Sequence, residues 1–214
     1  MPSTKACSAA DPLAAMRAAT RTLHAQAERS GFVRELLTGR ATHSGYALWL
    51  RNLWPAYATL ERALGAAPAG SPIAALADAR MMRATALEND LAALAGAEWR
   101  QTLPELAAGA AYARRIDAAW GAGAPQLAAH AYVRYLGDLN GGRVLRDILR
   151  TKLGLPDATL CFYAFDADSA ALETSYRAAL CNASEGDPEA AAREAALAFQ
   201  LNIALSEEVL AAAA

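Results

Sequence analysis

Three histidines, His24, His43 and His130, are the side chains of this 214-residue chain best suited to bind a transition metal. His24 lies in a stretch of helical periodicity, and Glu28 follows it by four residues. A carboxylate one helical turn away can accept the second imidazole N–H and leave the other nitrogen free for a metal. A helix histidine is nevertheless more often a core or surface residue than a ligand. The pattern indicates a surface position for His43 and leaves His130 open.

Three glycines within six residues, Gly137, Gly141 and Gly142, interrupt a strongly helical segment over residues 132–143. Each costs roughly 1 kcal/mol against alanine in a helix interior, so such a cluster indicates a functional gain. Without a Cβ, the backbone can approach a flat ligand such as a porphyrin, and the helix can bend. Tight packing between helices would explain the same glycines, and the segment alone leaves both interpretations open.

Asp138 lies between these glycines and four residues after Arg134, so the two side chains share a helix face and can pair. Gly142 lies four residues further along the same face. A carboxylate beside a glycine gap could hold ordered water near a ligand. The alternative is a solvated ion pair, which is common and contributes little to stability.

Other kinds of chemistry find little support in the composition. The formal net charge is -2 with 20 Lys and Arg residues and no basic run, which does not suggest nucleic-acid binding. No phosphate-binding glycine loop, Cys–His nucleophile or zinc motif is present. The cysteines Cys7, Cys161 and Cys181 are odd in number and lack metal-ligand spacing, which predicts free thiols in a reducing compartment.

No apolar stretch in the sequence reaches the ~20 residues that a membrane helix needs, and residues 1–10 lack a signal-peptide core. We therefore expect a cytoplasmic protein that contacts no membrane.

Helices must position these residues, because alanine supplies much of the 55% hydrophobic content and β-branched residues are sparse. Asp11 and Asp187 each precede a proline, which predicts a capped helix start. Pro55 should kink or divide the second helix. The sequence predicts one compact all-α domain over residues 11–210 after a disordered segment 1–10. The expected helices are 12–30, 42–64, 72–95, 104–120, 125–153, 169–181 and 188–210.

The glycine segment, extended to residues 127–142 as LAAHAYVRYLGDLNGG, closely resembles the signature of the biliverdin-forming heme oxygenases. Residues 19–28, around His24, resemble the proximal-histidine helix of that family. Weaker similarities follow in order along most of the chain. They are at residues 52–61, 84–91 and 198–203.

The resemblance implies an all-α fold that holds heme between a helix carrying His24 as axial iron ligand and a kinked distal helix carrying Gly137 to Gly142. Heme would be both cofactor and substrate, and Asp138 would organise distal water. Dioxygen and electrons from a donor such as a ferredoxin or reductase would convert heme to biliverdin, carbon monoxide and ferrous iron.

The resemblance also assigns the remaining site residues. Catalysis would involve Asp138, Arg134 and Tyr57. Contacts to heme would come from His24, Glu28, Arg17, Tyr132, Gly137, Gly141, Gly142, Arg177, Phe199 and Asn202. Glu173 departs from the vertebrate pattern, because a basic residue stands there in those enzymes and a carboxylate cannot pair with a heme propionate. The departure affects the expected orientation of the heme, and so the biliverdin isomer.

Three alternatives differ in what they require. A heme carrier or sensor on the same fold would keep His24 but would not need Asp138. A helical thiamin-degrading hydrolase would need a nucleophilic cysteine in a pocket, and none of the three cysteines lies in a motif that supports one. A pure interaction module is disfavoured, because the glycines cost stability without an obvious partner surface.

Overall fold

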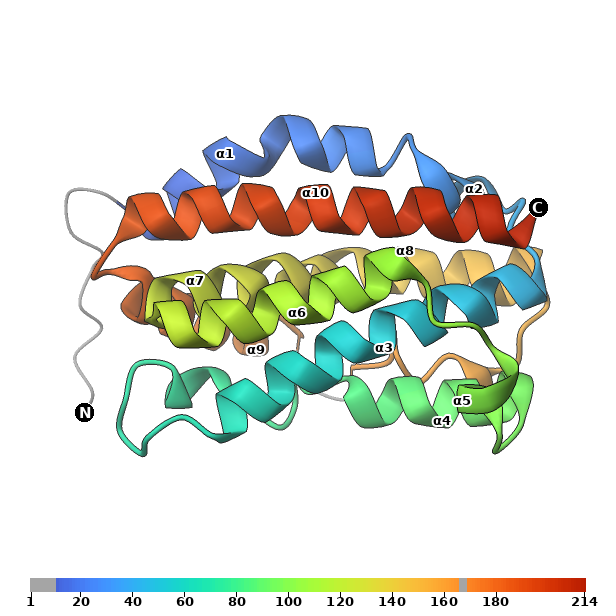
Figure 1. Ribbon diagram of the computed structural model, residues 1–214, viewed down its shortest axis with the longest axis horizontal. Coiled ribbons are helices and arrows are strands. Elements are labelled where there is room, and N and C mark those ends of the chain that lie inside the picture. The colour runs from blue at the N-terminus through green and yellow to red at the C-terminus, as the bar shows by residue number, and fades with distance from the viewer. Residues whose placement is uncertain (1–10, 166–168) are drawn as a thin grey trace.

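The computed structural model describes residues 11–165 and 169–214, and every regular element within them is a helix (Figure 1). The expected all-α fold is therefore confirmed, while the predicted disordered segment 1–10 lies outside the described residues. The α-helices are α1 (Pro12–Ala27), α2 (Gly31–Thr38), α3 (His43–Gly65), α4 (Ala84–Ala95), α5 (Trp99–Thr102), α6 (Ala107–Ala122), α7 (Ala124–Ala131), α8 (Gly137–Lys152), α9 (Ser169–Ser184) and α10 (Pro188–Ala213).

Helix α10 is the element around which the others are arranged, and it packs against α1, α2, α3, α6 and α7. Figure 1 shows α1 along one side of α10, with α6 and α7 on the other side and α3 and α4 beyond them. By length and composition alone α10 could cross a membrane, contrary to the expectation that no segment reaches this length. A core helix satisfies the same criteria, and its packing on five other helices identifies α10 as one.

Three helices begin at side-chain caps, and the sequence predicted two of these caps, Asp11 and Asp187. The side chains of Asp11, Thr42 and Asp187 accept hydrogen bonds from backbone N–H groups two or three residues later, at 3.0, 3.0 and 2.8 Å. Each bond satisfies a donor that the first helical turn leaves free. The starts of α1, α3 and α10 are confirmed.

The single helix predicted over residues 72–95 is wrong. Only a short 3₁₀ turn (Ala74–Leu76) and α4 form there, and α4 begins at Ala84. Its start is fixed by Glu61 of α3, whose carboxylate accepts the N–H groups of Arg83 and Ala84 at 2.5 and 2.9 Å. A cap supplied from another helix leaves no local sequence signal. Of the predicted kink or division at Pro55, the division does not occur, because α3 continues through the proline, while the kink stays a prediction.

A π-helical turn (Tyr132–Leu136) separates α7 from α8, where the sequence predicted one helix over residues 125–153. Such turns often occur at functional sites and are one cause of sharp bends. The extra residue per turn changes the faces on which the following side chains lie. The bend of this helix itself stays a prediction.

The cysteines differ from one another. Cys161 is free, as expected, but Cys181 is disulfide-bonded, so the expectation of a free thiol is wrong there. Cys7 lies outside the described residues.

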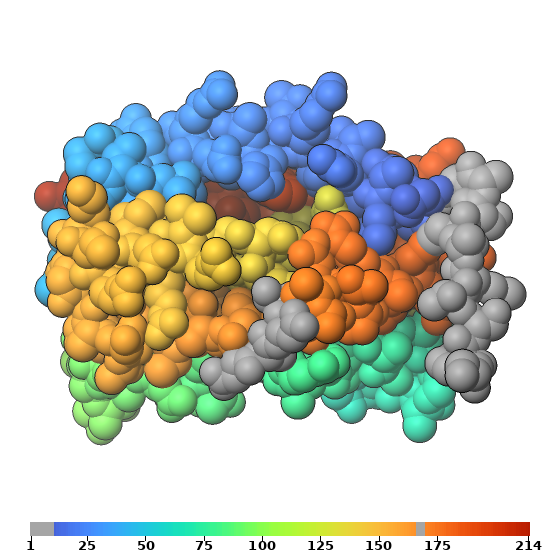
Figure 2. Space-filling model, turned by 180° about the vertical axis from the view of Figure 1, so that it is seen from behind, coloured from blue at the N-terminus to red at the C-terminus, as the bar shows by residue number. Residues whose placement is uncertain are grey.

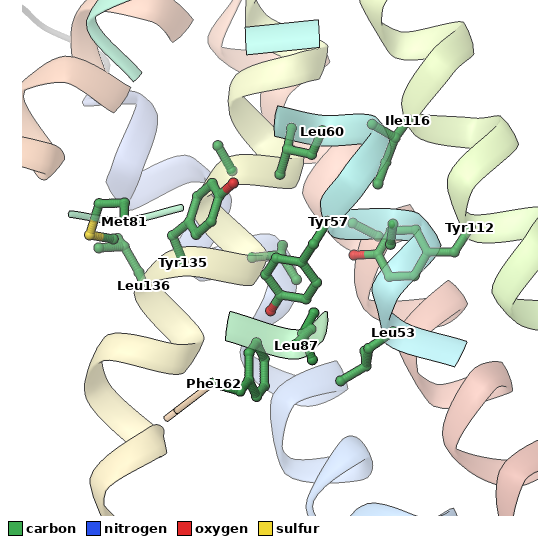
Figure 3. Packing of buried hydrophobic residues seen from close by; sticks show 14 of the residues in the cluster. Leu53, Tyr57, Leu60, Met81, Leu87, Tyr112, Ile116, Tyr135, Leu136 and Phe162 are labelled. Atoms are coloured by element: carbon green, nitrogen blue, oxygen red, sulfur yellow. The ribbon is translucent and has the colours of Figure 1, made fainter. Parts of the chain in front are cut away.

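Tyrosines occupy an unusual share of the core. Tyr46, Tyr57, Tyr112, Tyr135 and Tyr176 are all among the largest fully buried side chains. Figure 3 shows the Tyr57 ring surrounded by the rings of Tyr112, Tyr135 and Phe162 and by leucines. The hydroxyl groups of Tyr57, Tyr135 and Tyr176 donate hydrogen bonds within the protein, whereas those of Tyr46 and Tyr112 have no protein partner.

Gly31 begins α2 with a φ of +56°, and a Cβ placed on it would lie 2.4 Å from the backbone carbon of Ser206 in α10. We expect Gly31→Ala to lower the free energy of unfolding by about 1–3 kcal/mol more than Gly154→Ala does. Gly154 is the matched control, since its φ is +69° and its surroundings are open. Urea denaturation measures both, and equal losses would show that the contact with Ser206 does not matter.

Candidate functional site

A hollow runs along one face of the molecule between α1 and α8, and atoms of α10 are visible at its base (Figure 2). Both α1 and α8 are long enough to flank a ligand of porphyrin size, because each has 16 residues and spans about 24 Å. The hollow lies between the two segments in which the sequence analysis found its candidates, His24 and the glycines.

On the α1 side, the His24 side chain is 60% exposed, and its Nδ1 lies 3.5 Å from a carboxylate oxygen of Glu28. The arrangement follows from the four-residue spacing on one helix face. The His24 ring lies 5.7 Å from the ring of Phe199 on α10. With Nδ1 directed at the carboxylate, Nε2 is the nitrogen that remains for a metal.

The other two histidines are engaged elsewhere. His130 is fully buried, with its Nε2 2.8 Å from a carboxylate oxygen of Glu194, and burial lowers its pKa. His43 is exposed, as expected, and its Nε2 lies 2.6 Å from the carbonyl oxygen of Leu153. His24 is therefore the histidine whose geometry suits an external ligand.

On the α8 side, the three glycines have different surroundings. No atom lies within 4 Å of a Cβ built on Gly137 or Gly141, so both leave open space. A Cβ on Gly142 would lie 3.0 Å from the ring of Tyr163. Internal packing therefore accounts for Gly142, which the sequence analysis had counted as a ligand contact. Gly137 and Gly141 remain candidates for contact with a flat ligand.

Asp138 accepts a short hydrogen bond from the phenol of Tyr57, which α3 carries into the same region. Burial raises the pKa of Asp138 from an ordinary 3.8 to about 6, against the opposing effects of the Arg134 charge and of the Tyr57 hydrogen bond. The pKa of Tyr57 is raised well above its usual value by burial and by the Asp138 charge, so the phenol keeps its proton. The pair can hold and exchange a proton near neutral pH.

Arg134 does not form the expected ion pair with Asp138 among the residues that the structure describes. Its guanidinium instead lies over the rings of Tyr57 and Tyr112, at 5.9 and 5.5 Å from their centroids. Arg134 belongs to the π-helical turn, which removes the simple four-residue register with Asp138 that an α-helix would give. Its Nε is buried without a protein partner.

The remaining predicted contacts come from four different elements, α1, the π-helical turn, α9 and α10. Arg17 of α1 is exposed and Tyr132 of the π-helical turn is half-buried. Asn202 of α10 is buried, and its Oδ1 has no protein partner. Arg177 of α9 is half-exposed and donates from Nε to Glu173 at 2.7 Å. The carboxylate expected to disturb the site therefore neutralises its neighbouring arginine.

Sequence reasoning missed the aromatic residues that follow α8. Phe162 lies edge-on to Tyr57, with ring centroids 5.3 Å apart, and Tyr163 contacts Phe162 at 4.5 Å. The available signal was the aromatic sequence at residues 162–165, between the helices expected over 125–153 and 169–181, but it indicates no partner. Figure 3 shows Phe162 and Tyr57 next to each other.

Comparisons with known proteins identify the family. Residues 11–208 match the family model described as heme oxygenase. The chain is 35% identical over 205 residues to human heme oxygenase 1, covering 91% of this chain and 70% of that protein. It is 31% identical over 198 residues to heme oxygenase 1 of Synechocystis, covering 91% and 82%. The crystal structure of heme oxygenase-1 from Synechocystis in complex with heme superposes with a TM-score of 0.86 at 29% identity, covering 95% of this chain and 94% of that one.

The raised pKa of Asp138 predicts a pH-dependent cost to stability. A carboxyl group whose folded-state pKa exceeds its unfolded value binds its proton more tightly when folded, so stability falls as the pH rises from about 4 to about 6. Asp138→Asn should therefore raise the free energy of unfolding at pH 7.5 by about 1–2 kcal/mol.

The gain from Asp138→Asn should shrink as the pH is lowered to about 4, where the folded wild-type carboxyl is already protonated. Urea denaturation at the two pH values measures it. Asp147→Asn is the control on the same helix, because Asp147 is exposed. A gain of the same size at both pH values would contradict the assignment.

Proposed function

Because the chain belongs to the heme oxygenase family, we propose that the hollow between α1 and α8 is where it binds and oxidises heme. As a member of the family the chain is a heme-degrading oxidoreductase, for which heme is both substrate and prosthetic group. Biliverdin, carbon monoxide and ferrous iron are the products that follow from the family.

The observation that carries the placement is the open space over Gly137 and Gly141 of α8, together with the exposed imidazole of His24 on α1, the other helix that borders the hollow. A porphyrin is flat and mostly apolar, and two helix positions without a Cβ on one wall suit such a ring. The phenyl ring of Phe199, 5.7 Å from the His24 ring, adds an apolar surface beside the imidazole. The residues present therefore fit heme.

His24 is the proposed axial ligand, through Nε2. Glu28 beside Nδ1 sets the tautomer and the orientation of the ring, which strengthens the imidazole as a ligand. The exposure of His24 is consistent with this role, because a ligand to an external group must be reachable from the hollow.

When bound, heme supplies the iron at which dioxygen is reduced and the ring that is oxidised. On the distal side, the protein would hold and transfer protons. Tyr57 holds the Asp138 carboxyl in place, and a pKa of about 6 lets Asp138 accept and release a proton near neutral pH. The unpartnered Nε of Arg134 and Oδ1 of Asn202 are polar atoms that can order water there.

The heme propionates are carboxylates, which cationic side chains would bind. We propose that Arg17 pairs with them and that the Tyr132 hydroxyl donates a hydrogen bond to them. Arg177 is the second cation, but Glu173 already neutralises much of its charge. We therefore propose that Arg17 contributes more to propionate binding than Arg177 does. An unequal pair of anchors would turn the ring in its plane and so influence which biliverdin isomer forms.

The proposal includes dioxygen and an electron donor such as a ferredoxin or reductase as partners, and the cytoplasm as the place of action. The presence of soluble bacterial-type relatives supports this part.

The direct test supplies heme, dioxygen and a reductase system and follows the products by chromatography. The wild-type chain should consume heme and yield biliverdin, whereas a carrier would return the heme unchanged. His24→Ala should lose the histidine-ligated ferric spectrum while keeping its helical circular dichroism. His43→Ala is the control, since His43 bonds to the Leu153 carbonyl far along α8. A wild-type spectrum in His24→Ala would refute the ligand assignment.

Gly141→Leu tests whether the ring lies against α8. The change improves helix propensity by up to about 1 kcal/mol, so the heme-free chain should be as stable as wild type or more so. Heme affinity or turnover should nevertheless collapse, because the side chain fills the space proposed for the ring.

Gly121→Leu is the matched control for Gly141→Leu. Gly121 is also a helical glycine with open surroundings, but it lies in α6. Hemin titration and urea denaturation separate the two effects. Full heme binding by Gly141→Leu would show that the ring lies elsewhere.

A further inference from the structure

Asp90 of α4 is a fully buried carboxylate that none of the site residues contacts directly. Its two oxygens accept hydrogen bonds from the consecutive backbone N–H groups of Cys161 and Phe162, each at 2.8 Å. No basic side chain forms an ion pair with it in the part of the chain that the structure describes, and the neighbouring Arg146 pairs with Asp157 instead. A buried charge without a cation is costly, so both of its bonds must matter to the fold around it.

The segment that Asp90 holds has no helix or strand of its own to fix it. It is a turn in which the Ala164 N–H donates to the Cys161 carbonyl at 3.0 Å. Arg83 holds the far end by donating to the Ala164 carbonyl at 2.7 Å, and its guanidinium lies over the Phe165 ring. The turn is thus fixed from outside at both ends, and Asp90 supplies the two bonds nearest the proposed active site.

This turn carries the rings of Phe162 and Tyr163, which together form an aromatic wall behind Asp138. The Phe162 ring packs edge-on against Tyr57, the phenol that donates to Asp138. The Tyr163 ring fills the space left by Gly142, one turn after Asp138 on α8. Burial and the Asp138 charge raise the pKa of Tyr163.

We propose that Asp90 is a positioning residue for the distal side: by holding the backbone of Cys161 and Phe162, it sets the aromatic wall of Phe162 and Tyr163 that keeps Tyr57 against Asp138 and limits the exposure of the carboxyl group to bulk water. The inference rests on the proposed function for its catalytic meaning, but its structural consequence is present in the heme-free chain. Asp90 itself touches neither heme nor the reacting atoms.

The test is Asp90→Asn in the full-length, heme-free chain. The amide keeps the size of the side chain, but its NH₂ group faces one of the two backbone N–H groups, so one bond is lost. Hydrogen exchange at the Cys161 and Phe162 amides should accelerate about tenfold or more. Water entering behind the loosened wall should reduce the burial that raises the Asp138 pKa, which should fall from about 6 to about 5 in ¹³C-carboxyl NMR titration.

Glu208→Gln is the matched control. Glu208 of α10 likewise accepts two consecutive backbone N–H groups, those of Ala107 and Ala108, at 3.2 and 2.6 Å, but it caps α6 away from the aromatic wall. Its loss should reduce stability and leave the Asp138 titration unchanged. The inference fails if Asp90→Asn loses stability with no movement of the Asp138 pKa. It fails equally if Glu208→Gln moves that pKa as much.

If Asp90→Asn does not fold, Phe162→Leu takes its place. That change keeps both backbone bonds to Asp90 and removes only the ring that packs on Tyr57, so the Asp138 pKa should again fall. An unchanged titration would overturn the inference. These readouts need no heme, so a wild-type chain that fails to make biliverdin would refute the proposed function while the NMR result still decides the role of Asp90.

Discussion

The hydrogen bond from Tyr57 to Asp138 is the interaction on which the rest of the site depends. Burial raises the pKa of the Asp138 carboxyl to about 6, because the charged form loses contact with water, and this loss has a cost in free energy. The surrounding elements make this position tolerable. Helix α3 delivers the phenol, the π-helical turn directs α8, and the turn after α8 closes the space behind them. Elements that are far apart in the sequence thus fix the surroundings of this one carboxylate.

Much of the fold was predictable because its signals are local. Caps such as Asp11 and Asp187 satisfy their own helices, so sequence alone located the starts of α1 and α10. The predictions failed where partners come from far along the chain. Glu61 sets the beginning of α4 from α3, and packing inserts a π-helical turn that no propensity encodes.

In the candidate site, too, contacts between residues close in the sequence were predictable and contacts between distant residues were not. The spacing of His24 and Glu28 predicted their proximity correctly, because four residues on a helix determine it. The spacing of Arg134 and Asp138 predicted a pair that the π-helical turn prevents, and the partner is Tyr57, 81 positions away. For the glycine cluster the sequence left ligand contact and helix packing both open, and the structure separates the members: Gly142 accommodates Tyr163, while Gly137 and Gly141 leave open space. A partner from a distant part of the chain produces no sequence signal near the residue that it contacts.

The central position of α10 has a consequence for how the protein is made. This helix is synthesised after all the helices against which it packs, and its largest partner, α1, lies at the other end of the described chain. Contacts between such distant segments form slowly, because a long loop must close first. Until α10 leaves the ribosome, the apolar faces of α1, α3 and α7 have no cover. Heme can therefore meet a completed hollow only after α10 has been synthesised and has packed against α1.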